Sequence, residues 1–382
     1  MRCTPEAIST ALLDIDRRQL RRRREPATDG RINFCSNDYL GLARDPRIAA
    51  AMAEAASRLG AGSGASHLIS GHSSEHEALE QELAVFTGRE RALVFSTGYM
   101  ANLGVLTALA DRRDVLIADE LNHASLIDAA RLARSERYQW YAHGDAQAAE
   151  TLLRSAPSSD TEDRGVFVIT DGVFSMDGDL APLPALAALA QKHDGWLIVD
   201  DAHGLGVVGE TGRGSCEVFG VGSKEVPVLV GTFGKAFGTF GAFVAGDAEV
   251  IELLIQRART YIYTTALPPA VAAATRAALE IVQQESWRRD HLRALIARFR
   301  EGARRRGLRV TDSTTPIQPM ILGRAEDALI ASAKLSAAGF RVTAIRPPTV
   351  PEGTARLRIT LSAAHTESQV DGLLSALEAA GS

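Results

Sequence analysis

The feature that most constrains the fold of this chain is a regular alternation of short apolar runs with amphipathic helical segments. The apolar runs lie near residues 92–95, 115–118, 166–170, 196–200 and 227–232. Short strands that alternate with helices are typical of an α/β domain whose mostly parallel sheet is covered by helices. Functional residues of such sheets collect at the carboxyl ends of the strands. The residues that follow these runs are therefore the first candidates for a site.

Lys235 follows the last of these runs, in the segment 228–238 (VLVGTFGKAFG). The flanking glycines, Gly234 and Gly238, let the chain turn tightly and approach a ligand closely. A lysine held beside a buried strand does not remain an ordinary solvated ammonium. It either pairs with an anion or serves as an amine nucleophile.

The run at 196–200 ends in Asp200, and His203 lies three residues further on. A carboxylate and a histidine followed by Lys235 match the needs of pyridoxal phosphate. The lysine forms a Schiff base with the cofactor, the acid keeps the pyridine nitrogen protonated, and the histidine holds the ring oxygen. Each residue alone is a weak signal, but together they predict a pyridoxal-phosphate enzyme.

Two other strand ends carry residues with both a structural and a functional interpretation. Gly98 opens a helix after the run at 92–95, which makes either a plain turn or a phosphate seat of free N–H groups. His123 follows the run at 115–118, where a lone histidine is more often structural. Because Lys235 lies downstream, we favour phosphate binding at Gly98 and a cofactor-stacking ring at His123.

Composition excludes several classes of partner. The chain has 382 residues, 23% of them charged and 46% apolar, which suits a large domain with a smaller companion. Its net charge of −5 argues against nucleic acid or an anionic membrane as a partner. Cys3, Cys35 and Cys216 are odd in number and scattered, as expected for reduced thiols in the cytoplasm. No run is long enough to span a membrane, and the N-terminus lacks the apolar core of a signal peptide.

Residues 72–76 (HSSEH) literally match a metalloprotease pattern. Ser74 and Glu77 are predicted to form a capping box, so the helix should begin near Ser74 and leave His72 outside it. The two histidines would then not share one helical face, and no metal is expected.

Two further motif matches fail in their context. Residues 60–65 (GAGSGA) match a dinucleotide-binding pattern, but they follow a helix predicted over residues 46–60 instead of a strand. Residues 171–179 contain three acids, but no glutamate stands at the offset that a calcium loop requires.

Arginines mark both ends of the chain. A helix predicted over residues 6–24 ends in the run 21–24 (RRRR), which is either a solvated helix end or a site for phosphates of an anionic substrate. Arg346 and Arg358 flank a proline-stiffened segment and are candidate carboxylate clamps, although most arginines of such a chain lie on the surface. Asn37 lies in a predicted turn, where its ordinary role is structural.

The pattern changes after helices predicted over 270–284 and 286–306. From about residue 308 the order is strand, helix (about 326–338), two strands and a last helix. This order predicts a small α/β domain with a mainly antiparallel sheet.

Several segments carry a resemblance to a known family. Residues 200–204 (DDAHG) and 232–235 (TFGK) resemble the fold-type I pyridoxal-phosphate enzymes, in particular the α-oxoamine synthases. The similarity runs from about residue 8 to the end. Five other segments fit the family, the last two being similar to its biotin-pathway branch: 37–41 (NDYLG), 122–125 (NHAS), 173–178 (VFSMDG), 346–351 (RPPTVP) and 353–358 (GTARLR).

The resemblance implies an N-terminal segment over residues 1–45, a large cofactor-binding domain over 46–290 and a small C-terminal domain over 291–382. It also assigns cofactor contacts. Lys235 would form the Schiff base, Asp200 would pair with the pyridinium, and His123 would stack on the ring and take part in catalysis. His203 and Ser175 would hold the phenolic oxygen. The phosphate would be held by Gly98, Tyr99 and Thr232, with Thr265 reaching across from a second subunit.

The resemblance implies substrate contacts as well. Arg358 would grip the carboxylate of an amino acid, and His123 would lie beside it. The residues nearer the acyl substrate would be Arg21, Asn37, Arg346 and Thr349. Relatives commonly carry glutamate where this chain has Asp171, so the role of that residue stays open, and any of the arginines 21–24 can take the role given to Arg21.

The implied reaction is a decarboxylative condensation of L-alanine with a pimeloyl thioester, catalysed by a homodimer with its site at the subunit interface. The thioester carrier is either coenzyme A or acyl carrier protein. Four alternatives stay open: a glycine-using relative that makes 5-aminolevulinate or 2-amino-3-oxobutyrate, a serine-using relative that makes sphingoid bases, an aminotransferase, and a non-catalytic cofactor-binding sensor.

Overall fold

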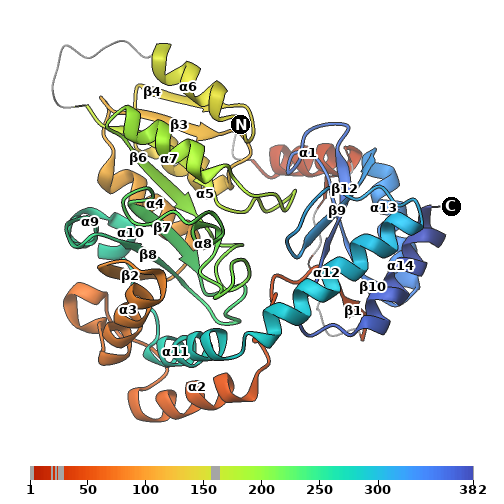
Figure 1. Cartoon of the computed structure of the whole chain (residues 1–382), viewed down its shortest axis with the longest axis horizontal. Coiled ribbons are helices and arrows are strands. Elements are labelled where there is room, and N and C mark those ends of the chain that lie inside the picture. Colours follow the sequence, from red (N-terminus) through yellow and green to blue (C-terminus); the bar gives the residue numbers. More distant parts are fainter. Residues whose placement is uncertain (1–3, 19, 22–23, 25–29, 156–163, 382) are drawn as a thin grey trace.

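The computed structural model describes residues 4–18, 20, 21, 24, 30–155 and 164–381. A large α/β part holds the central sheet, and a smaller part at the C-terminus lies beside it, joined to it by the long helix α12 (Trp287–Arg305) (Figure 1). Arg22 and Arg23, two members of the arginine run 21–24, lie outside the described residues.

The central sheet has seven strands in the order β2-β8-β7-β6-β5-β3-β4. All of them are parallel except β8, which runs antiparallel to both of its neighbours. The predicted mostly parallel sheet is confirmed, and all five predicted strands are present. The bounds are β2 (Arg91–Phe95), β3 (Val115–Asp119), β4 (Arg137–Tyr141), β5 (Val166–Asp171), β6 (Trp196–Asp200), β7 (Val228–Thr232) and β8 (Ala242–Gly246).

Helices cover both faces of this sheet, and each face has its own apolar core. On one face lie α4 (Gly98–Leu109), α5 (Ala124–Leu132) and α9 (Ala248–Arg257). On the other lie α6 (Ala146–Ser155), α7 (Leu183–Lys192) and the short α8 (Ser215–Phe219). The strands are buried on both faces, which explains why their sequences read as continuous apolar runs.

The smaller part is built on a three-stranded antiparallel sheet, in the order β11-β12-β9. Its elements are β9 (Ile317–Gly323), α13 (Ala325–Ala337), β10 (Phe340–Arg341), β11 (Thr343–Ile345), β12 (Ala355–Thr360) and α14 (Glu367–Gly381). The predicted antiparallel sheet is confirmed, with one strand more than expected. That strand, β10, pairs in parallel with β1 (Ile32–Asn33) and ties the N-terminal segment to this part. The three domain boundaries given above stay a prediction.

The N-terminal helix is shorter than predicted. α1 (Pro5–Arg17) ends four residues before the arginine run, so the prediction of a helix over residues 6–24 is wrong at its C-terminal end. Four consecutive like charges repel one another along a helix and offer no apolar face to bury.

The helices α2 and α3 lie close to their predicted positions. α2 (Pro46–Leu59) begins at its proline and ends at Gly60, which has φ 84°. α3 (Ser74–Thr87) begins where predicted, but the capping box was placed one residue too late. Ser73 is the N-cap, and Nδ1 of His76 accepts from the Ser73 N–H at 3.0 Å, so a histidine ring replaces the expected Glu77 carboxylate.

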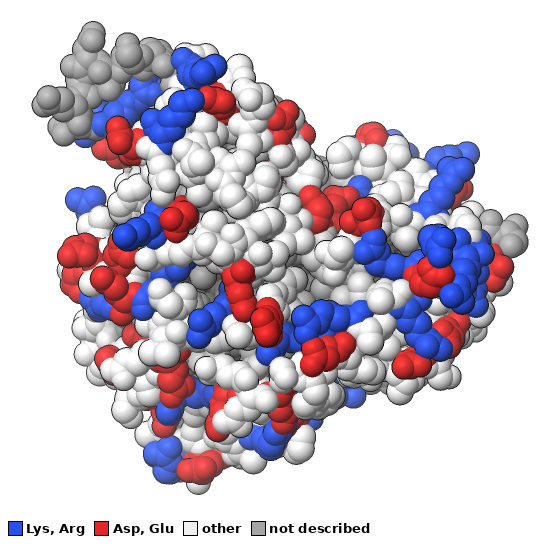
Figure 2. Space-filling model, viewed as in Figure 1, with Lys and Arg blue, Asp and Glu red and all other residues white. Residues whose placement is uncertain are grey.

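The remaining helices are η1 (His67–Gly71), the one-turn α10 (Arg259–Ile262) and α11 (Pro269–Gln284). α10 takes up the first residues of the segment 261–269, which was expected to be a loop throughout. No helix among the described residues is long and apolar enough to cross a bilayer. On the face shown in Figure 2, basic and acidic side chains are interspersed.

Candidate functional site

Lys235 lies in a tight turn that leaves the carboxyl end of β7. The turn folds back on itself, because the Phe233 N–H donates to the Gly241 carbonyl and the Thr239 N–H donates to the Phe233 carbonyl, both at 2.9 Å. Burial lowers the pKa of Lys235 to about 8, although Asp200 and Asp171 favour its charged form. The turn therefore holds an amine that is easily made neutral and nucleophilic.

Asp200 ends β6, the strand next to β7, and its carboxylate is buried at 7% exposure. Asn102 of α4 donates from Nδ2 to Asp200 Oδ2 at 2.6 Å, and the Ala202 N–H donates to Oδ1 at 3.0 Å. These two bonds fix the carboxylate and still leave acceptor positions for a third donor. Asn102 was not predicted, although one buried polar residue in the middle of an apolar helix was an available signal.

His203 follows Asp200 in the next turn and is buried. Its Nδ1 lies 2.7 Å from the Tyr39 hydroxyl, a contact between segments 164 residues apart that no local pattern predicts. Burial, then Lys235 and Arg358, hold the pKa of His203 well below its usual range. Burial also raises the pKa of Tyr39 to about 12. The pair therefore consists of a neutral imidazole and a protonated phenol.

His123 follows β3 and is the N-cap of α5. Its backbone N–H donates to Asp171 Oδ2 at 3.1 Å, and its ring Nδ1 lies 2.7 Å from the Ser125 hydroxyl. Asp171 pairs with Asp200 in the register of β5 and β6. Burial and the Asp200 charge raise the pKa of Asp171 well above its usual range, which favours its protonated form. Burial lowers the pKa of His123, although Asp200 favours its charged form.

A further part of the site is formed by the first turn of α4 and by Thr232, the last residue of β7. Gly98 and Tyr99 belong to the first turn of α4, where backbone N–H donors have no partner within the helix. Thr232 donates its hydroxyl to the Gly241 carbonyl at 3.0 Å. A helix N-terminus with a neighbouring hydroxyl suits a phosphate group.

These side chains enclose one cavity of about 190 Å³. It has an amine, a buried carboxylate and a helix N-terminus, which is the donor and acceptor set that pyridoxal phosphate requires. The residues therefore fit the cofactor. The lining consists of Gly98, Tyr99, His123, Ser125, Asp171, Val173, Ser175, Asp200, Ala202, His203, Thr232 and Lys235.

Arg358 and Asn37 adjoin this cavity. Arg358 of β12 donates from Nε to the Ser175 carbonyl at 2.6 Å and from both terminal nitrogens to Asn37 Oδ1 at 3.2 Å. Arg358 is only 7% exposed, and these two acceptors are neutral. A guanidinium in this setting is well placed to bind a carboxylate.

Besides Arg358 and Asn37, four further predicted site residues do not line the cavity within one chain. Arg21 is exposed and pairs with Asp16 at 2.7 Å. Thr265 and Thr349 are exposed, and Arg346 is half-buried on the segment between β11 and β12. Their predicted roles need either a second subunit or a bound substrate.

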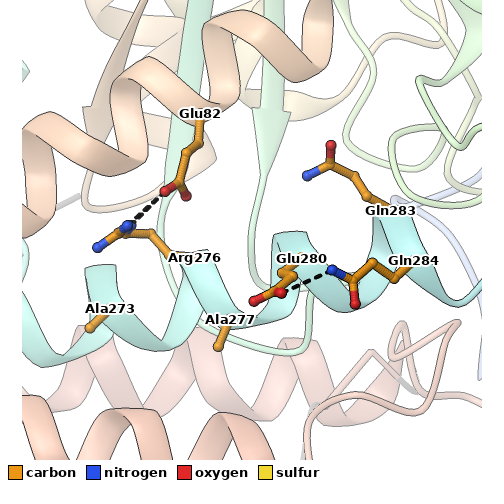
Figure 3. A pocket seen from close by; sticks show the side chains of 7 residues that line it. All are labelled: Glu82, Ala273, Arg276, Ala277, Glu280, Gln283 and Gln284. Carbon is orange, nitrogen blue, oxygen red and sulfur yellow. Dashed lines mark hydrogen bonds and ion pairs between the residues drawn. The ribbon is translucent and has the colours of Figure 1, made fainter.

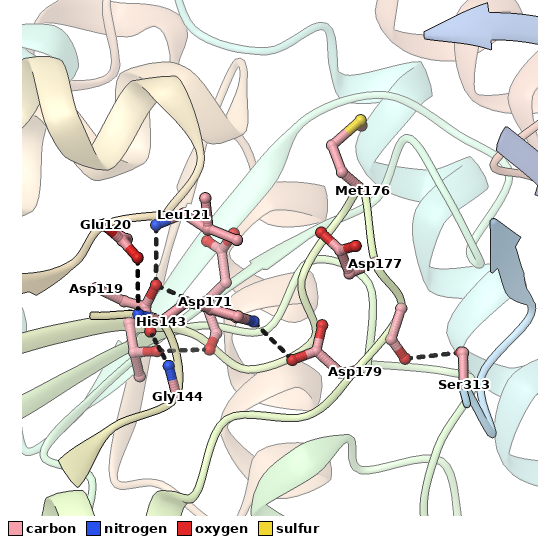
Figure 4. Close-up of polar contacts among 12 residues, drawn as sticks. Asp119, Glu120, Leu121, His143, Gly144, Asp171, Met176, Asp177, Asp179 and Ser313 are labelled. Atoms are coloured by element: carbon pink, nitrogen blue, oxygen red, sulfur yellow. Dashed lines mark hydrogen bonds and ion pairs between the residues drawn. The ribbon is translucent and has the colours of Figure 1, made fainter. Parts of the chain in front are cut away.

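A polar network supports the turn that carries Ser175 (Figure 4). His143 lies between two carboxylates, 3.0 Å from Asp119 Oδ1 and 2.9 Å from Asp179 Oδ2. Ser313 donates to the Gly178 carbonyl at 2.9 Å, which ties the turn to the smaller part. Burial alone would lower the pKa of His143, but the bonds to the two carboxylates raise it to about 10.

A separate depression of about 510 Å³ lies between α3 and α11. Figure 3 shows the side chains that line it. Its arginine, Arg276, pairs with Glu82 at 2.7 Å, and Gln284 donates to Glu280 at 2.9 Å. These side chains already satisfy one another, and we assign no role to the depression.

The fold and the site together define a class. The family model for aminotransferase class I and II matches residues 29–377. The chain belongs to this family and is a fold-type I pyridoxal-phosphate enzyme. A high-resolution structure of SPT with a PLP internal aldimine has a TM-score of 0.90 at 30% identity, covering 99% of this chain and 97% of that one.

The nearer relatives narrow the class to one enzyme. The 8-amino-7-oxononanoate synthase of Thioalkalivibrio sulfidiphilus is 60% identical over 366 residues, 95% of this chain and 92% of the relative. The enzyme of the same name from Methylococcus capsulatus is 61% identical over 347 residues, 91% of this chain and 88% of the relative. The crystal structure of 8-amino-7-oxononanoate synthase from Francisella tularensis has a TM-score of 0.79 at 32% identity, covering 92% of this chain and 98% of that one. The resemblance predicted from the sequence motifs is confirmed at the level of the 8-amino-7-oxononanoate synthases.

Proposed function

We propose that the protein is a transferase that condenses L-alanine with a pimeloyl thioester and releases 8-amino-7-oxononanoate, carbon dioxide and free thiol, a step of biotin biosynthesis. The observation that carries this proposal is the cavity that joins Lys235, Asp200 and the start of α4, with Arg358 beside it. The names of the relatives at 55–61% identity support the choice of substrates.

The cofactor would be held through five sets of contacts. Lys235 would bind it covalently, and Asp200 would hold the proton on the pyridine nitrogen. His203 and Ser175 would contact the ring oxygen. Gly98, Tyr99 and Thr232 would bind the phosphate, while His123 would stack on the ring.

Bound pyridoxal phosphate supplies an electron sink for the charge that develops at the alanine Cα. Lys235 Nζ, free again once the alanine amine has taken its place on the cofactor, would accept the Cα proton. Its pKa of about 8 allows the free amine to be neutral near physiological pH. A positioned general base of this kind contributes ~10²–10⁴-fold to the rate. Asp200 would supply much of the remaining effect, because its buried carboxylate stabilises the protonated ring.

Arg358 would bind the alanine carboxylate. We further propose that Asn37, Arg346, Thr349 and one of the arginines 21–24 lie near the acyl substrate, whose carrier is coenzyme A or acyl carrier protein. The half-buried position of Arg346 and the contact of Asn37 with Arg358 support this arrangement.

We also propose a homodimer in the cytoplasm, with Thr265 reaching the phosphate site of the other subunit. Thr265 is exposed and lies outside the cavity of its own chain. Apolar side chains near it are exposed as well, including Ile69 at 80% and Tyr263 at 71%, and exposed apolar patches often mark interfaces. The unpaired Cys35 and Cys216 suit a reducing compartment.

The test is a substrate screen with the cofactor-loaded enzyme, in which free thiol and carbon dioxide are followed together. We expect both products with alanine and pimeloyl-CoA, or with pimeloyl acyl carrier protein. Glycine with a short acyl-CoA, and serine with palmitoyl-CoA, should react far more slowly. Faster turnover of serine with palmitoyl-CoA, or amino transfer to a keto acid without thiol release, would contradict the proposal.

A further inference from the structure

Three histidines that the proposed reaction does not use meet at the start of α3. His67 belongs to η1, His72 to the link that follows, and His76 to the first turn of α3. One ring nitrogen of each lies within 4.8 Å of the other two, and the ring centroids are 4.9–5.4 Å apart. The sequence-based argument against a metal considered only the pair His72 and His76, because nothing in the pattern brought His67 to them.

Two of the three rings are fixed by the fold. His76 is fully buried, and its Nε2 donates to the Leu267 carbonyl at 2.6 Å. His67 is 7% exposed and stacks on Tyr261, with a centroid separation of 4.9 Å and an interplanar angle of 12°. The side chain of His72 is 31% exposed, so it provides a path from solvent. The site is therefore preorganised on one side and open on the other.

The ring nitrogens have lone pairs to offer. Nδ1 of His67 and Nδ1 of His72 lie 3.0 Å apart and share one proton. When an ion binds, this proton moves to the other nitrogen of its ring or to solvent, and both lone pairs become available. His67 and His76 are buried, and burial favours the neutral form of an imidazole ring. Neutral imidazole is the form that binds metal ions.

Two of the three histidines have the outer partners that metal-binding histidines usually have. A ligating histidine commonly donates its other N–H to a carbonyl or a carboxylate, which sets the tautomer and the ring direction. His76 does so to Leu267, and Nε2 of His72 lies 3.4 Å from Glu77 Oε2. Two competing bonds to His76 Nδ1 must be given up, one from the Ser73 N–H at 3.0 Å and one from the Ser73 hydroxyl at 2.9 Å.

We propose that His67, His72 and His76 form a binding site for one divalent transition-metal ion of the zinc class. Imidazole ligands suit zinc, copper and nickel, and three histidines leave a fourth position for water. The ion would join η1 to the start of α3. The site would lie next to the Leu267 carbonyl, two residues before α11 begins. This site lies outside the cofactor cavity, whose lining includes none of the three histidines.

The experiment uses the untagged, cofactor-loaded enzyme after dialysis against a chelator. Zinc chloride is titrated in competition with a chromophoric chelator, and cobalt chloride gives a second readout through its visible ligand-field bands. We expect one ion per chain, a Kd below about 1 μM, and the cobalt bands of a site with nitrogen ligands.

His72→Ala is the decisive variant, because His72 is the most exposed of the three and its loss leaves the buried contacts of His67 and His76 in place. We expect it to weaken zinc binding by about 100-fold or more, while His193→Ala, a histidine away from the cluster, binds as the wild type does. Circular dichroism in chelator would show that both variants are folded. A wild-type Kd above about 10 μM, or equal zinc binding by wild type and His72→Ala, would overturn the proposal.

Discussion

Lys235 is the side chain on which the proposed chemistry depends, and its environment makes a prediction about pH. Burial lowers its pKa to about 8, so the amine is charged below this pH and neutral above it. Only the neutral amine attacks the cofactor aldehyde. In cofactor-free protein, the rate of reconstitution with pyridoxal phosphate should therefore rise about tenfold per pH unit up to about pH 8 and then level off. A rate that continues to rise to pH 10, as for an ordinary solvated lysine, would contradict this environment.

Asn102 is a positioning residue whose role can be separated from folding. Its bond to Asp200 at 2.6 Å joins a neutral amide to a carboxylate, and such bonds contribute about 1.5–3 kcal/mol. Asn102→Leu should therefore lower kcat by roughly 10–100-fold, while a folded protein still takes up the cofactor. Thr107→Ala, on the same helix but bonded to the Leu103 carbonyl, is the control and should keep wild-type kcat. Unchanged kcat in Asn102→Leu would show that Asp200 does not need this support.

Among the secondary-structure elements, His143 joins the ends of β3 and β4 to the turn that carries Ser175. Its pKa of about 10 in the folded state lies above the ordinary value of about 6.5. The folded protein therefore binds this proton more tightly than the unfolded protein does. The contribution of the charged His143 to the free energy of unfolding is complete below about pH 6.5 and is lost as pH rises through 10. Because Asp119 is almost fully buried, His143→Gln should destabilise the protein by about 3 kcal/mol at pH 6.5.

Urea unfolding of wild type and His143→Gln at pH 6.5 and pH 10 measures this difference. The gap between their free energies of unfolding should narrow at pH 10, because the wild type loses its charged histidine there. His193→Gln is the control, with no gap expected at either pH. A gap of the same size at both pH values would mean that His143 stabilises the turn by packing alone.

The strands that could be predicted from sequence are the ones buried on both faces. β3, β5, β6 and β7 read as apolar runs, and their carboxyl ends correctly located the cavity-lining side chains of Lys235, Asp200 and His123. β4 was missed because, unlike the other edge strand β2, it has only one buried residue and keeps polar residues, with Trp140 56% exposed. β8 was missed because its five residues follow directly on a glycine-rich turn, and no change in the sequence pattern marks where the strand begins.

The contacts within the site were harder to foresee than its position. Tyr39 meets His203 and Asn102 meets Asp200 across 164 and 98 residues of chain, and no local periodicity encodes such a distance. The histidine cluster was missed for the same reason, since η1 is a short π-helical turn without an amphipathic pattern. Motif resemblance named Arg358 and Ser175, but only the structure joins the side chain of one to the carbonyl of the other.

For the whole molecule, the proposed dimer makes a prediction about complementation. If Thr265 serves the site of the other subunit, a Thr265→Ala chain leaves the site of its partner without this threonine. A Lys235→Ala chain leaves its own site without the amine. A mixed dimer then has one complete site, formed by Lys235 of one chain and Thr265 of the other. Co-refolding equal amounts should give about a quarter of wild-type activity at limiting cofactor, where each variant alone is weak. Activity no higher than the mean of the two variants would contradict a shared site.

The central claim, that Lys235 and Asp200 form a pyridoxal-phosphate site, is tested most directly by visible absorption of the purified protein. Wild type loaded with pyridoxal phosphate should show the band of a lysine-bound cofactor, change it on addition of L-alanine, and release thiol when pimeloyl-CoA follows. Lys192→Ala, which removes an exposed lysine paired with Glu150, should behave in the same way. Lys235→Ala should lack the lysine-bound band and turnover. A folded Lys235→Ala protein that keeps both, or a wild-type protein that remains colourless with the cofactor, would contradict the account.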